Sequence, residues 1–426
     1  MLRPSLLFIW LMVVMTIVSC NSAPKGSDTT ISTGPWRMSL ELVENTELPF
    51  DFDLNETEEG FEVIVKNSLE RIEVNEVEIS EDSFFMRMPI FDSEFHGKII
   101  EGKKIEGYWT DLSRGKDYKI PFTATYGEQP RFIAKSKDEP IQLAPTWEAV
   151  FSPESETDVY PAIGKFIQTG NRVTGTFLTE IGDYRYLEGI VEGNQLKLSA
   201  FDGSHAFLLI ADLDDEGNLK GNFWSGSHWL EPWVATPNPN AELREPDAIT
   251  YLKEGYDKVN FAFPNLAGDT ITLDDPLYQD KVVIIQLMGS WCPNCMDETK
   301  LFSKWYRQYQ NQGLEIVGVA FERSPDLETA ARNLSRLKEH FNVGYEYVIA
   351  SIKNDKAIAE EKFPMLNRVI SFPTAIYIDR TGKVRKIHTG FNGPGTGEPY
   401  QRFVDEYGLF IESLLREGNA DNMAKK

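Results

Sequence analysis

The sequence predicts an α/β domain in the C-terminal part of the chain, preceded by a duplicated antiparallel all-β region. From Trp36 to about Thr236, short runs alternate apolar and polar residues and are broken by Gly, Asn and Asp, which is typical of antiparallel strands. After residue 258 the pattern changes to longer apolar runs separated by segments with helical spacing. A chain of 426 residues with 41% hydrophobic content is long enough for two or three domains with their own cores.

The N-terminus has the pattern of an export signal. Arg3 precedes an apolar run from Leu6 to Val18, which is typical of a signal peptide. The last residues of this run, Ile17 to Cys20, resemble a lipobox, where a bacterial lipoprotein is cleaved and its cysteine lipidated. We therefore expect a signal peptide over 1–19, lipidation of Cys20 and a flexible tether over 20–35. An ordinary cleaved signal peptide is the alternative. The lipobox implies a chain anchored in the cell envelope of a Gram-negative bacterium and facing the periplasm.

The β region shows weak internal similarity, which predicts one β repeat over 36–130 and a second over 146–236. Three pairs of segments are separated by 110 or 111 residues, and a fourth pair is separated by 115, which requires a small insertion. These pairs are Trp36 with Trp147, Phe91–Ser93 with Phe201–Gly203, Pro121–Thr125 with Pro232–Thr236, and Gly107–Trp109 with Asn222–Trp224. Two small barrels, two sandwiches or a pair of packed sheets all fit this pattern.

Residues 237–258 are rich in Pro, Asn and charged residues and are expected to form a linker. The α/β domain is expected over 259–426. Its predicted strands are Val282–Met288, Leu314–Phe321, Tyr345–Ala350 and a hairpin of Thr374–Asp379 with Val384–His388. Its predicted helices are Met296–Gln310, Asp326–His340 and about Tyr400–Leu415. Strands and helices alternate first, and two strands and a helix follow, which is the thioredoxin-like order.

Two cysteines follow the first of these strands, within the sequence from Trp291 to Cys295. Cys292 is expected at the N-terminus of a helix, where unpaired N–H groups and the helix dipole lower a cysteine pKa from ~8.5 toward ~3.5 to 7.5. Pro293 suits the first turn because its missing N–H costs nothing there. Cys295 lies on the same helical face but deeper. We therefore expect Cys292 to attack a disulfide and Cys295 to resolve the mixed disulfide.

Two other interpretations of the cysteine pair are a structural zinc site and a purely structural disulfide. A zinc site needs four ligands, and none of the five histidines lies near the pair with ligand spacing. A loop this short gives a structural disulfide little entropic stabilisation. We therefore expect no metal and no cofactor other than the Cys292–Cys295 pair itself.

At this point the chain resembles a known family. The residues concerned are Val282–Cys295, the following Glu298, Ser371–Thr374 downstream and Phe261–Gly268 upstream. Together they resemble the membrane-anchored thioredoxin-like reductases of the TlpA/ResA type, in the redoxin or AhpC/TSA superfamily. The resemblance covers about residues 259–415 and implies a thiol–disulfide oxidoreductase.

The resemblance also implies roles for further residues. Pro373 would be the cis-proline that faces the disulfide, and Phe372 would offer backbone groups to an extended substrate. Trp291, Pro293 and Thr374 would complete the substrate-binding surface. Glu298, on the helical face of Cys295, would exchange protons with that thiol or tune it, or would be an ordinary solvated carboxylate. Cytosolic thioredoxins carry a buried Asp where this chain has Gln286. Because a neutral amide takes no proton, Glu298 or water would have to accept the proton in its place.

A peroxiredoxin-like peroxidase is a competing interpretation. Those enzymes orient the peroxide with a Thr three residues before the reactive cysteine, and here that position is Gly289. The missing Thr disfavours a peroxidase, although a CxxC pair can still reduce peroxides slowly.

Other chemistry-bearing residues give weaker signals. In the β region, three polar residues lie near three tryptophans and suggest a metal or carbohydrate site, although aromatic residues at strand spacing are more often core. Gly390–Gly397 is glycine-rich but lacks the ending of a phosphate loop, His388 is expected at a strand end, and Arg323 either shapes the pocket or is solvated. The β-region residues are Asp202, His205, His228, Trp224, Trp229 and Trp233.

Taken together, the sequence predicts a lipid-anchored thiol–disulfide oxidoreductase that reduces or exchanges disulfides of exported proteins and is itself reduced by a membrane electron donor. A formal net charge of −23 disfavours nucleic-acid binding. The alternative from another class is a binding or scaffold lipoprotein whose β repeats capture a partner or a glycan.

Overall fold

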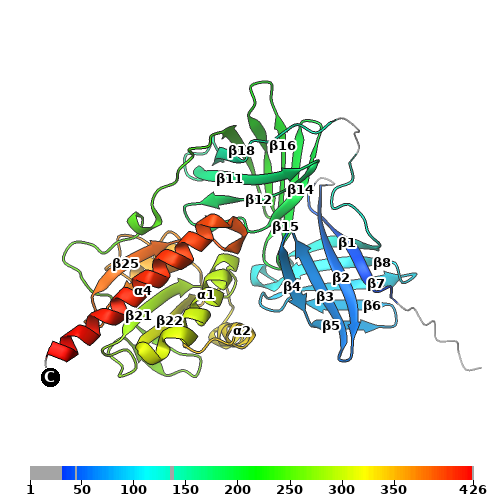
Figure 1. Ribbon diagram of the computed structural model, residues 1–426. Coiled ribbons are helices and arrows are strands. Elements are labelled where there is room, and N and C mark those ends of the chain that lie inside the picture. Colours follow the sequence, from blue (N-terminus) through cyan, green and yellow to red (C-terminus); the bar gives the residue numbers. More distant parts are fainter. Residues whose placement is uncertain (1–30, 44–45, 135–138, 425–426) are drawn as a thin grey trace, which may run out of the picture.

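The computed structural model describes residues 31–43, 46–134 and 139–424. The expected signal peptide, Cys20 and most of the expected tether lie outside these described residues. The described chain forms two antiparallel β domains and a C-terminal α/β domain (Figure 1). We call the first β domain the N-terminal sheet and the second the closed sheet.

The N-terminal sheet contains nine strands in the order β4-β3-β2-β1-β9-β8-β7-β6-β5. Side chains alternate between buried and partly exposed positions along its strands, as in β3, where Val63, Val65 and Asn67 point inward. The strands are β1 (Gly34–Glu41), β2 (Glu47–Thr57), β3 (Gly60–Asn67), β4 (Glu70–Val74), β5 (Glu76–Ser80), β6 (Ser83–Arg87), β7 (Ser93–Ile100), β8 (Lys104–Asp111) and β9 (Lys119–Tyr126). A short 3₁₀ turn, η1 (Leu112–Arg114), joins β8 to β9.

The closed sheet runs in the order β11-β10-β18-β17-β16-β15-β14-β12-β13, and an additional pairing of β11 with β12 joins its two sides. Closure satisfies the backbone groups that an open edge would leave unpaired. The strands are β10 (Thr146–Phe151), β11 (Tyr160–Thr169), β12 (Arg172–Thr179), β13 (Gly182–Asp183), β14 (Leu187–Glu192), β15 (Gln195–Phe201), β16 (Ala206–Leu213), β17 (Leu219–Ser225) and β18 (Trp229–Pro237).

The two β domains share part of one core. Phe201 and Leu208 of the closed sheet are fully buried among the apolar residues of the N-terminal sheet. Phe201 stacks on Phe50 with ring centroids 4.4 Å apart, and its backbone exchanges two hydrogen bonds with the side chain of Asn67. Such desolvated contacts fix the angle between the two sheets.

The predicted duplication stays a prediction. Both sheets pair their first strand with their last, β1 with β9 and β10 with β18. Trp36 and Trp147 lie buried on these first strands, and each indole N–H donates to a carbonyl a few residues upstream.

Segment 237–258, expected to be a linker, makes specific contacts with the C-terminal domain. It contains a 3₁₀ turn, η2 (Pro246–Ala248), and Leu252 forms an isolated bridge with Leu366. Asp247 accepts a hydrogen bond from the Tyr407 hydroxyl and lies 2.8 Å from Nδ1 of His388. Its sequence was typical of a loop, but tertiary contacts hold it in place.

The C-terminal domain has a five-stranded sheet in the order β23-β22-β21-β24-β25, with β21, β22 and β23 parallel and β24 and β25 antiparallel to their neighbours. The strands are β21 (Val282–Met288), β22 (Leu314–Phe321), β23 (Glu346–Ser351), β24 (Thr374–Ile378) and β25 (Val384–Thr389), with a small hairpin of β19 (Ala262–Pro264) and β20 (Thr270–Thr272) before them. The helices are α1 (Pro293–Tyr309), α2 (Leu327–His340), α3 (Lys356–Lys362) and α4 (Glu398–Ala424), with 3₁₀ turns η3 (Gln310–Gln312) and η4 (Pro394–Thr396).

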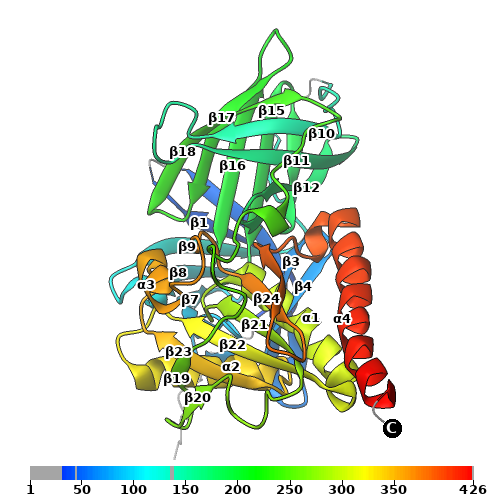
Figure 2. The same cartoon turned by 90° about the vertical axis from the view of Figure 1, so that its left-hand side faces the viewer.

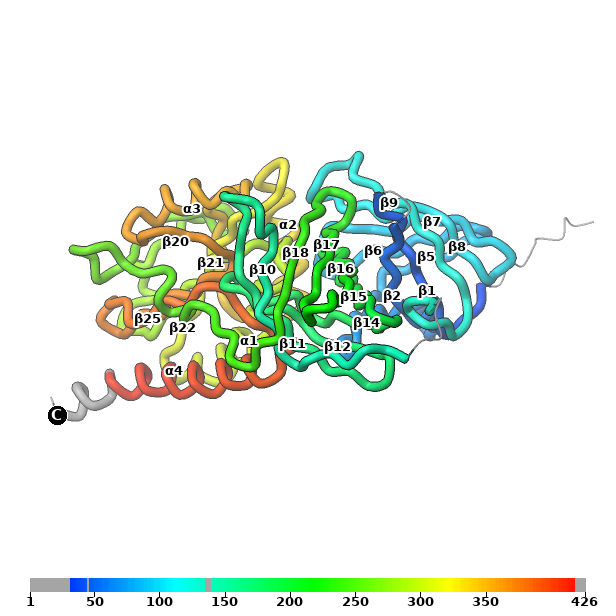
Figure 3. Tube along the Cα trace, turned by 90° about the horizontal axis from the view of Figure 1, so that it is seen from above, coloured from blue at the N-terminus to red at the C-terminus, as the bar shows by residue number. Residues whose placement is uncertain are grey.

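The order of these elements is the predicted thioredoxin-like order. The sequence did not predict α3, because seven residues are too few for a clear helical period. The helices cover both faces of the sheet: α1 and α4 meet through stacked Trp305 and Phe403, and Figure 3 shows α2 and α3 on the opposite side of the sheet from α4. Among the described residues, no helix is both long and apolar enough to cross a membrane.

The three domains are packed together. Figure 2 shows the closed sheet next to both the N-terminal sheet and the C-terminal domain. Phe91 of the N-terminal sheet belongs to the buried core of the C-terminal domain. The C-terminal domain is therefore covered in part by the β domains, and the closed sheet contacts it where β21 ends and α1 begins.

Candidate active site

The cysteine pair lies where β21 ends and α1 begins. Cys292 is the residue that caps α1, and the backbone N–H of Cys295 donates to its sulfur at 3.2 Å. Pro293 occupies the first turn, where a backbone donor is not needed. The two sulfurs form a disulfide across Cα atoms 5.2 Å apart. Cys292 is 5% exposed and Cys295 is fully buried, so that a substrate reaches Cys292 first.

A loop before β24 faces this disulfide. The Phe372–Pro373 peptide bond is cis, as the resemblance implies for Pro373. The carbonyl oxygen of Phe372 lies 3.4 Å from the sulfur of Cys292. Thr374, buried at the start of β24, donates its hydroxyl to the carbonyl of Ser371 and so fixes the loop. The backbone next to the reactive sulfur is therefore held in one conformation.

Trp291 covers one side of the motif. Its indole N–H donates to the carbonyl of Phe321 at 2.9 Å, and its ring packs edge-on against Phe372. The guanidinium of Arg323 lies over the same ring, 3.8 Å from its centroid. Arg323, for which the sequence left two roles open, is thus half-buried beside the redox pair.

Glu298 is fully buried inside α1, so it is not a solvated carboxylate. Gln286 of β21 donates its amide to Glu298 at 2.9 Å and to the backbone carbonyl of Cys295 at 3.3 Å. Burial raises the pKa of Glu298 to about 8, and the Gln286 hydrogen bond lowers it only in part. One amide therefore links the second cysteine to an acid that exchanges its proton near neutral pH.

A second buried acid, Glu322, was not predicted. It follows β22 and accepts hydrogen bonds from the backbone and hydroxyl of Ser290, at 2.8 and 2.6 Å. Burial raises its pKa to about 7, against the effect of the Ser290 bonds. Glu322 fixes the residue just before Trp291, and its distance along the chain from the motif hid this contact in the sequence.

Gly289 has no room for a side chain. A Cβ at this position would lie 2.2 Å from Nε1 of Trp291 and 2.8 Å from the carbonyl oxygen of Phe321. The Thr that a peroxiredoxin uses there does not fit beside this tryptophan, which strengthens the argument against peroxidase chemistry.

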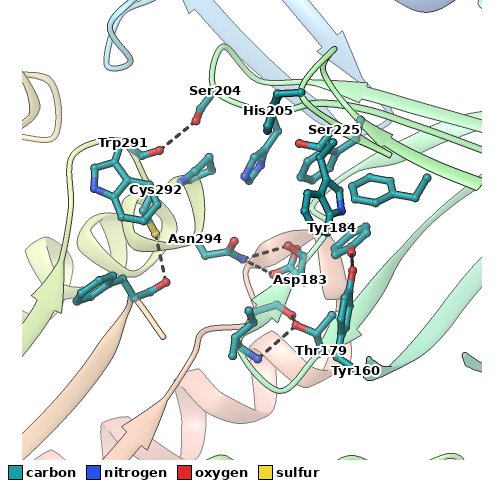
Figure 4. Close-up of a pocket in the computed structure, with 18 of the residues that line it drawn as sticks. Tyr160, Thr179, Asp183, Tyr184, Ser204, His205, Ser225, Trp291, Cys292 and Asn294 are labelled. Carbon is teal, nitrogen blue, oxygen red and sulfur yellow. Dashed lines mark hydrogen bonds between the residues drawn. The ribbon is translucent and has the colours of Figure 1, made fainter. Parts of the chain in front are cut away.

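The closed sheet contributes contacts to the motif that the sequence did not predict. The turn from Gly182 to Tyr186 reaches the motif from this sheet. In the structure, the amide of Asn294, between the two cysteines, donates to the side chain of Asp183 at 3.2 Å (Figure 4). Ser204 donates to the carbonyl of Trp291 at 3.0 Å.

Arg185, in the same turn, joins all three domains. Its guanidinium binds Asp297 of α1 and Glu70 of the N-terminal sheet, and its Nε lies 3.2 Å from Asp202 of the closed sheet. It also donates to the carbonyl of Pro293 at 3.3 Å. Burial by itself would lower the pKa of Arg185, but the three carboxylates raise it well above its usual value. No local pattern marks such a residue.

The comparisons with known proteins concern the C-terminal domain. Residues 255–387 match the model of the AhpC/TSA family. This part of the chain is an AhpC/TSA redoxin domain. It is 29% identical over 143 residues to the thiol-disulfide oxidoreductase ResA of Halalkalibacterium halodurans, covering 32% of this chain and 69% of that protein. It is 28% identical over 139 residues to ResA of Bacillus subtilis, covering 33% and 69%.

Solved structures also match the redoxin domain. A thiol:disulfide interchange protein of the thioredoxin family from Chlorobium tepidum matches with 16% identity and a TM-score of 0.29, covering 41% of this chain and 99% of that one. The redoxin domain contains the Cys292–Cys295 disulfide, and the ResA relatives that it resembles in sequence are named thiol–disulfide oxidoreductases.

The remaining predicted residues lie around or away from the redoxin site. Asp202 and His205 lie 3.1 Å apart, and His228 contacts the hydroxyl of Tyr118 at 2.9 Å. Within the described ranges, no group of three or more His, Cys, Asp or Glu side chains is arranged to hold a metal ion.

Trp233 is buried in the closed sheet, Trp224 packs against the N-terminal sheet and Trp229 is 43% exposed. His388 lies in β25, bound to Asp247 and Tyr407. In the glycine-rich loop, Gly393 donates its backbone N–H to Asp183.

Proposed function

We propose that this chain is a lipid-anchored thiol–disulfide oxidoreductase that reduces or exchanges disulfides of exported proteins. The observation that carries this proposal is the capping position of Cys292, bonded to a buried Cys295 and faced by cis-Pro373. A thiolate at a helix N-terminus is stabilised by the helix dipole and is the nucleophile of disulfide exchange. The names of the ResA relatives support the same class of activity.

In the proposed reaction, the Cys292 thiolate attacks one sulfur of a client disulfide, and the other client sulfur leaves as a thiolate. The thiolate of Cys295 then attacks the sulfur of Cys292, releases the second client thiol and closes the Cys292–Cys295 disulfide. Two electrons pass to the client, which takes up two protons. A membrane electron donor reduces the pair again. Glu298, with its pKa near 8, is the group we assign to hold the proton of Cys295.

Substrate trapping tests this proposal. Without Cys295 the mixed disulfide has no resolving thiol, so the Cys295→Ala variant should accumulate covalent client adducts through Cys292. The measurement is non-reducing electrophoresis with mass spectrometry of the adducts, and insulin reduction by the wild-type chain provides the activity. The double variant Cys292→Ala/Cys295→Ala is the control and should trap nothing. A variant without adducts, together with a wild type that does not reduce insulin, would rule out the oxidoreductase.

The proposed location has its own test. Cys20 would carry the lipid that holds the chain in the cell envelope of a Gram-negative bacterium, facing the periplasm. Lipid attachment requires the thiol, so Cys20→Ser should move the chain from the membrane fraction to the soluble periplasmic fraction. The measurement is fractionation with immunoblotting, and membrane retention of the variant would argue against lipidation.

A further inference from the structure

The cysteine pair opens into a cavity that the redoxin domain forms together with the β domains. Its volume is about 440 Å³, and it reaches from Cys292 into the closed sheet. In Figure 4, Trp291 and Cys292 lie on one side and Tyr184 and Ser225 of the closed sheet on the other; Phe372 lines the cavity as well. A volume of this size accommodates a few amino-acid residues but not the surface of a folded protein.

The wall formed by the closed sheet is aromatic. Tyr184 packs against Phe207 and Phe223 with ring centroids 5.3 and 5.1 Å apart, and all three line the cavity. Trp229 lines it as well, and because this side chain is 43% exposed it is available to a ligand. An aromatic recess next to a reactive sulfur favours a large apolar side chain close to the substrate's cysteine.

Hydrogen bonds between the closed sheet and three segments next to the reactive cysteine narrow the access to it. Ser204 holds the backbone at Trp291, Asp183 holds the side chain of Asn294, and the carbonyl of Ile181 accepts from Ser371 in the cis-proline loop at 2.9 Å. Because these contacts border the motif, a disulfide lying flat on a folded surface does not reach Cys292. A substrate has to enter the cavity as a narrow, extended segment.

The cavity also contains a cation, Arg323, whose pKa is lowered by burial and by Arg114 and is raised only in part by the charge of Asp111. Among the described residues, Arg323 has no carboxylate within salt-bridge distance, and Asn354, with its amide oxygen turned toward the guanidinium, accepts at 2.8 and 3.0 Å. The other arginine of the cavity, Arg114, pairs with Asp111 at 3.0 Å. Burial, and then Arg114 and Arg323, lower the pKa of His228 to about 4, so this neighbour is neutral at pH 7.

The acids of the cavity already have partners. Asp183 accepts from Asn294 and from the backbone of Gly393. Glu231 accepts from the hydroxyls of Ser152 and Tyr160 at 2.5 and 2.7 Å. Arg323 is therefore the charge that a ligand is best placed to neutralise, and a carboxylate matches its geometry.

We infer that this cavity binds an extended peptide segment that carries a large aromatic side chain on one side of its cysteine and a carboxylate on the other. The inference rests on the proposed function and names its substrate class. The aromatic side chain enters the recess of the closed sheet, the carboxylate meets Arg323, and the cysteine sulfur lies against Cys292. The β domains thus select the substrate of the redoxin domain.

Four matched reporter peptides test this inference. Each has one cysteine joined by a disulfide to thionitrobenzoate, with Phe or Gly on one side and Glu or Gln on the other. The reduced full chain attacks the disulfide and releases the coloured thiolate, and the second-order rate constant is divided by that of dithiothreitol with the same peptide. The Phe/Glu peptide should exceed the Gly/Gln peptide by about tenfold or more, the scale of pocket discrimination.

Two variants assign the preference to its residues. Arg323→Gln should abolish the preference for Glu over Gln and keep the preference for Phe over Gly. Trp229→Ala should abolish the preference for Phe over Gly and keep the preference for Glu over Gln. Arg332→Gln and Tyr256→Ala are matched controls, since both side chains are exposed away from the cavity, and should keep both ratios. Ratios within one variant do not depend on the fraction of folded protein.

The outcomes separate this inference from the proposed function. Equal normalised rates for all four peptides with an active wild type, or preferences that survive in both variants, would overturn the inference alone. A reduced chain that releases no reporter from any peptide would overturn the proposed function, and the inference with it.

Discussion

At Glu298, a single carboxyl group is buried without an ionic partner among the residues that the structure describes. Its Oε2 accepts from Gln286, and its Oε1 has no hydrogen-bond partner in the same part of the chain. Desolvation of the charged form is why its pKa rises from 4.5 to about 8. The titratable groups that interact with it, Tyr345 and Tyr377, are buried as well and their pKa values are raised, so both stay neutral below pH 9.

This burial predicts a pH dependence of stability. Between pH 4.5 and about 8 the folded chain holds a proton on Glu298 that the unfolded chain has lost. The contribution of this proton to the free energy of unfolding is therefore fully present below pH 4.5 and is lost as the pH rises through 8. In Glu298→Gln, whose amide does not titrate, this loss is absent.

Urea unfolding of the oxidised proteins from pH 4 to 9 measures the effect. The free energy of unfolding of the variant minus that of the wild type should increase with pH over this window. Other buried acids, such as Asp297 and Glu322, titrate equally in both proteins and cancel in the difference. A difference independent of pH would show that Glu298 is ionised in the folded chain throughout.

At the scale of elements, the connection from β21 to α1 sets the geometry of the redox pair. The strand is buried along its whole length, and the helix starts within a few residues of its end. Gly289 makes this sharp turn compatible with the indole of Trp291, which occupies the space of a side chain. Elsewhere, as at Gly408 in α4, a glycine has open space around its Cα.

These two glycines predict opposite effects of the same substitution. Gly289→Ala should lower the free energy of unfolding by ~1–3 kcal/mol, because its methyl group overlaps Trp291 and Phe321. Gly408→Ala should raise it by ~0.5–1 kcal/mol, because alanine loses less backbone entropy in a helix. Urea unfolding followed by tryptophan fluorescence measures both. A neutral Gly289→Ala would mean that the indole moves aside at little cost.

At the scale of the whole molecule, Arg185 is the residue that ties the domains to the redox helix. It meets one carboxylate from each of the three domains in a position where its side chain is only 11% exposed. Removing one partner of a buried ionic network leaves the others charged and desolvated, which costs far more than removing an exposed pair. The arrangement of the cavity in front of Cys292 therefore depends on this one side chain.

Arg185→Met should destabilise the chain by ~3–5 kcal/mol, because Asp297, Glu70 and Asp202 lose their shared partner. The matched control is Arg416→Met, which removes an exposed pair with Glu412 on α4 and should cost under ~1 kcal/mol. The midpoint of urea unfolding compares the two variants. Similar small effects for both would mean that the three carboxyl groups take up protons when the arginine is lost.

The sequence by itself determined the C-terminal fold and the chemistry of its site. Hydrophobic periodicity and the Trp291–Cys295 motif are local patterns, so they predicted β21, α1, the order of the later elements and the unequal roles of Cys292 and Cys295. The resemblance supplied Pro373. The β region was predicted as antiparallel for the same local reason, but barrels, sandwiches and packed sheets were all left open, because strand partners are set by contacts between distant residues.

Only the tertiary structure decided what lies in front of the reactive cysteine. Asp183, Arg185 and Ser204 are unremarkable in the sequence and reach the motif through the packing of separate domains. The burial of Glu298 and Glu322, and with it their raised pKa values, also follows from neighbours far along the chain. Local spacing predicts where a side chain lies on its own element, whereas desolvation and domain contacts depend on the whole fold.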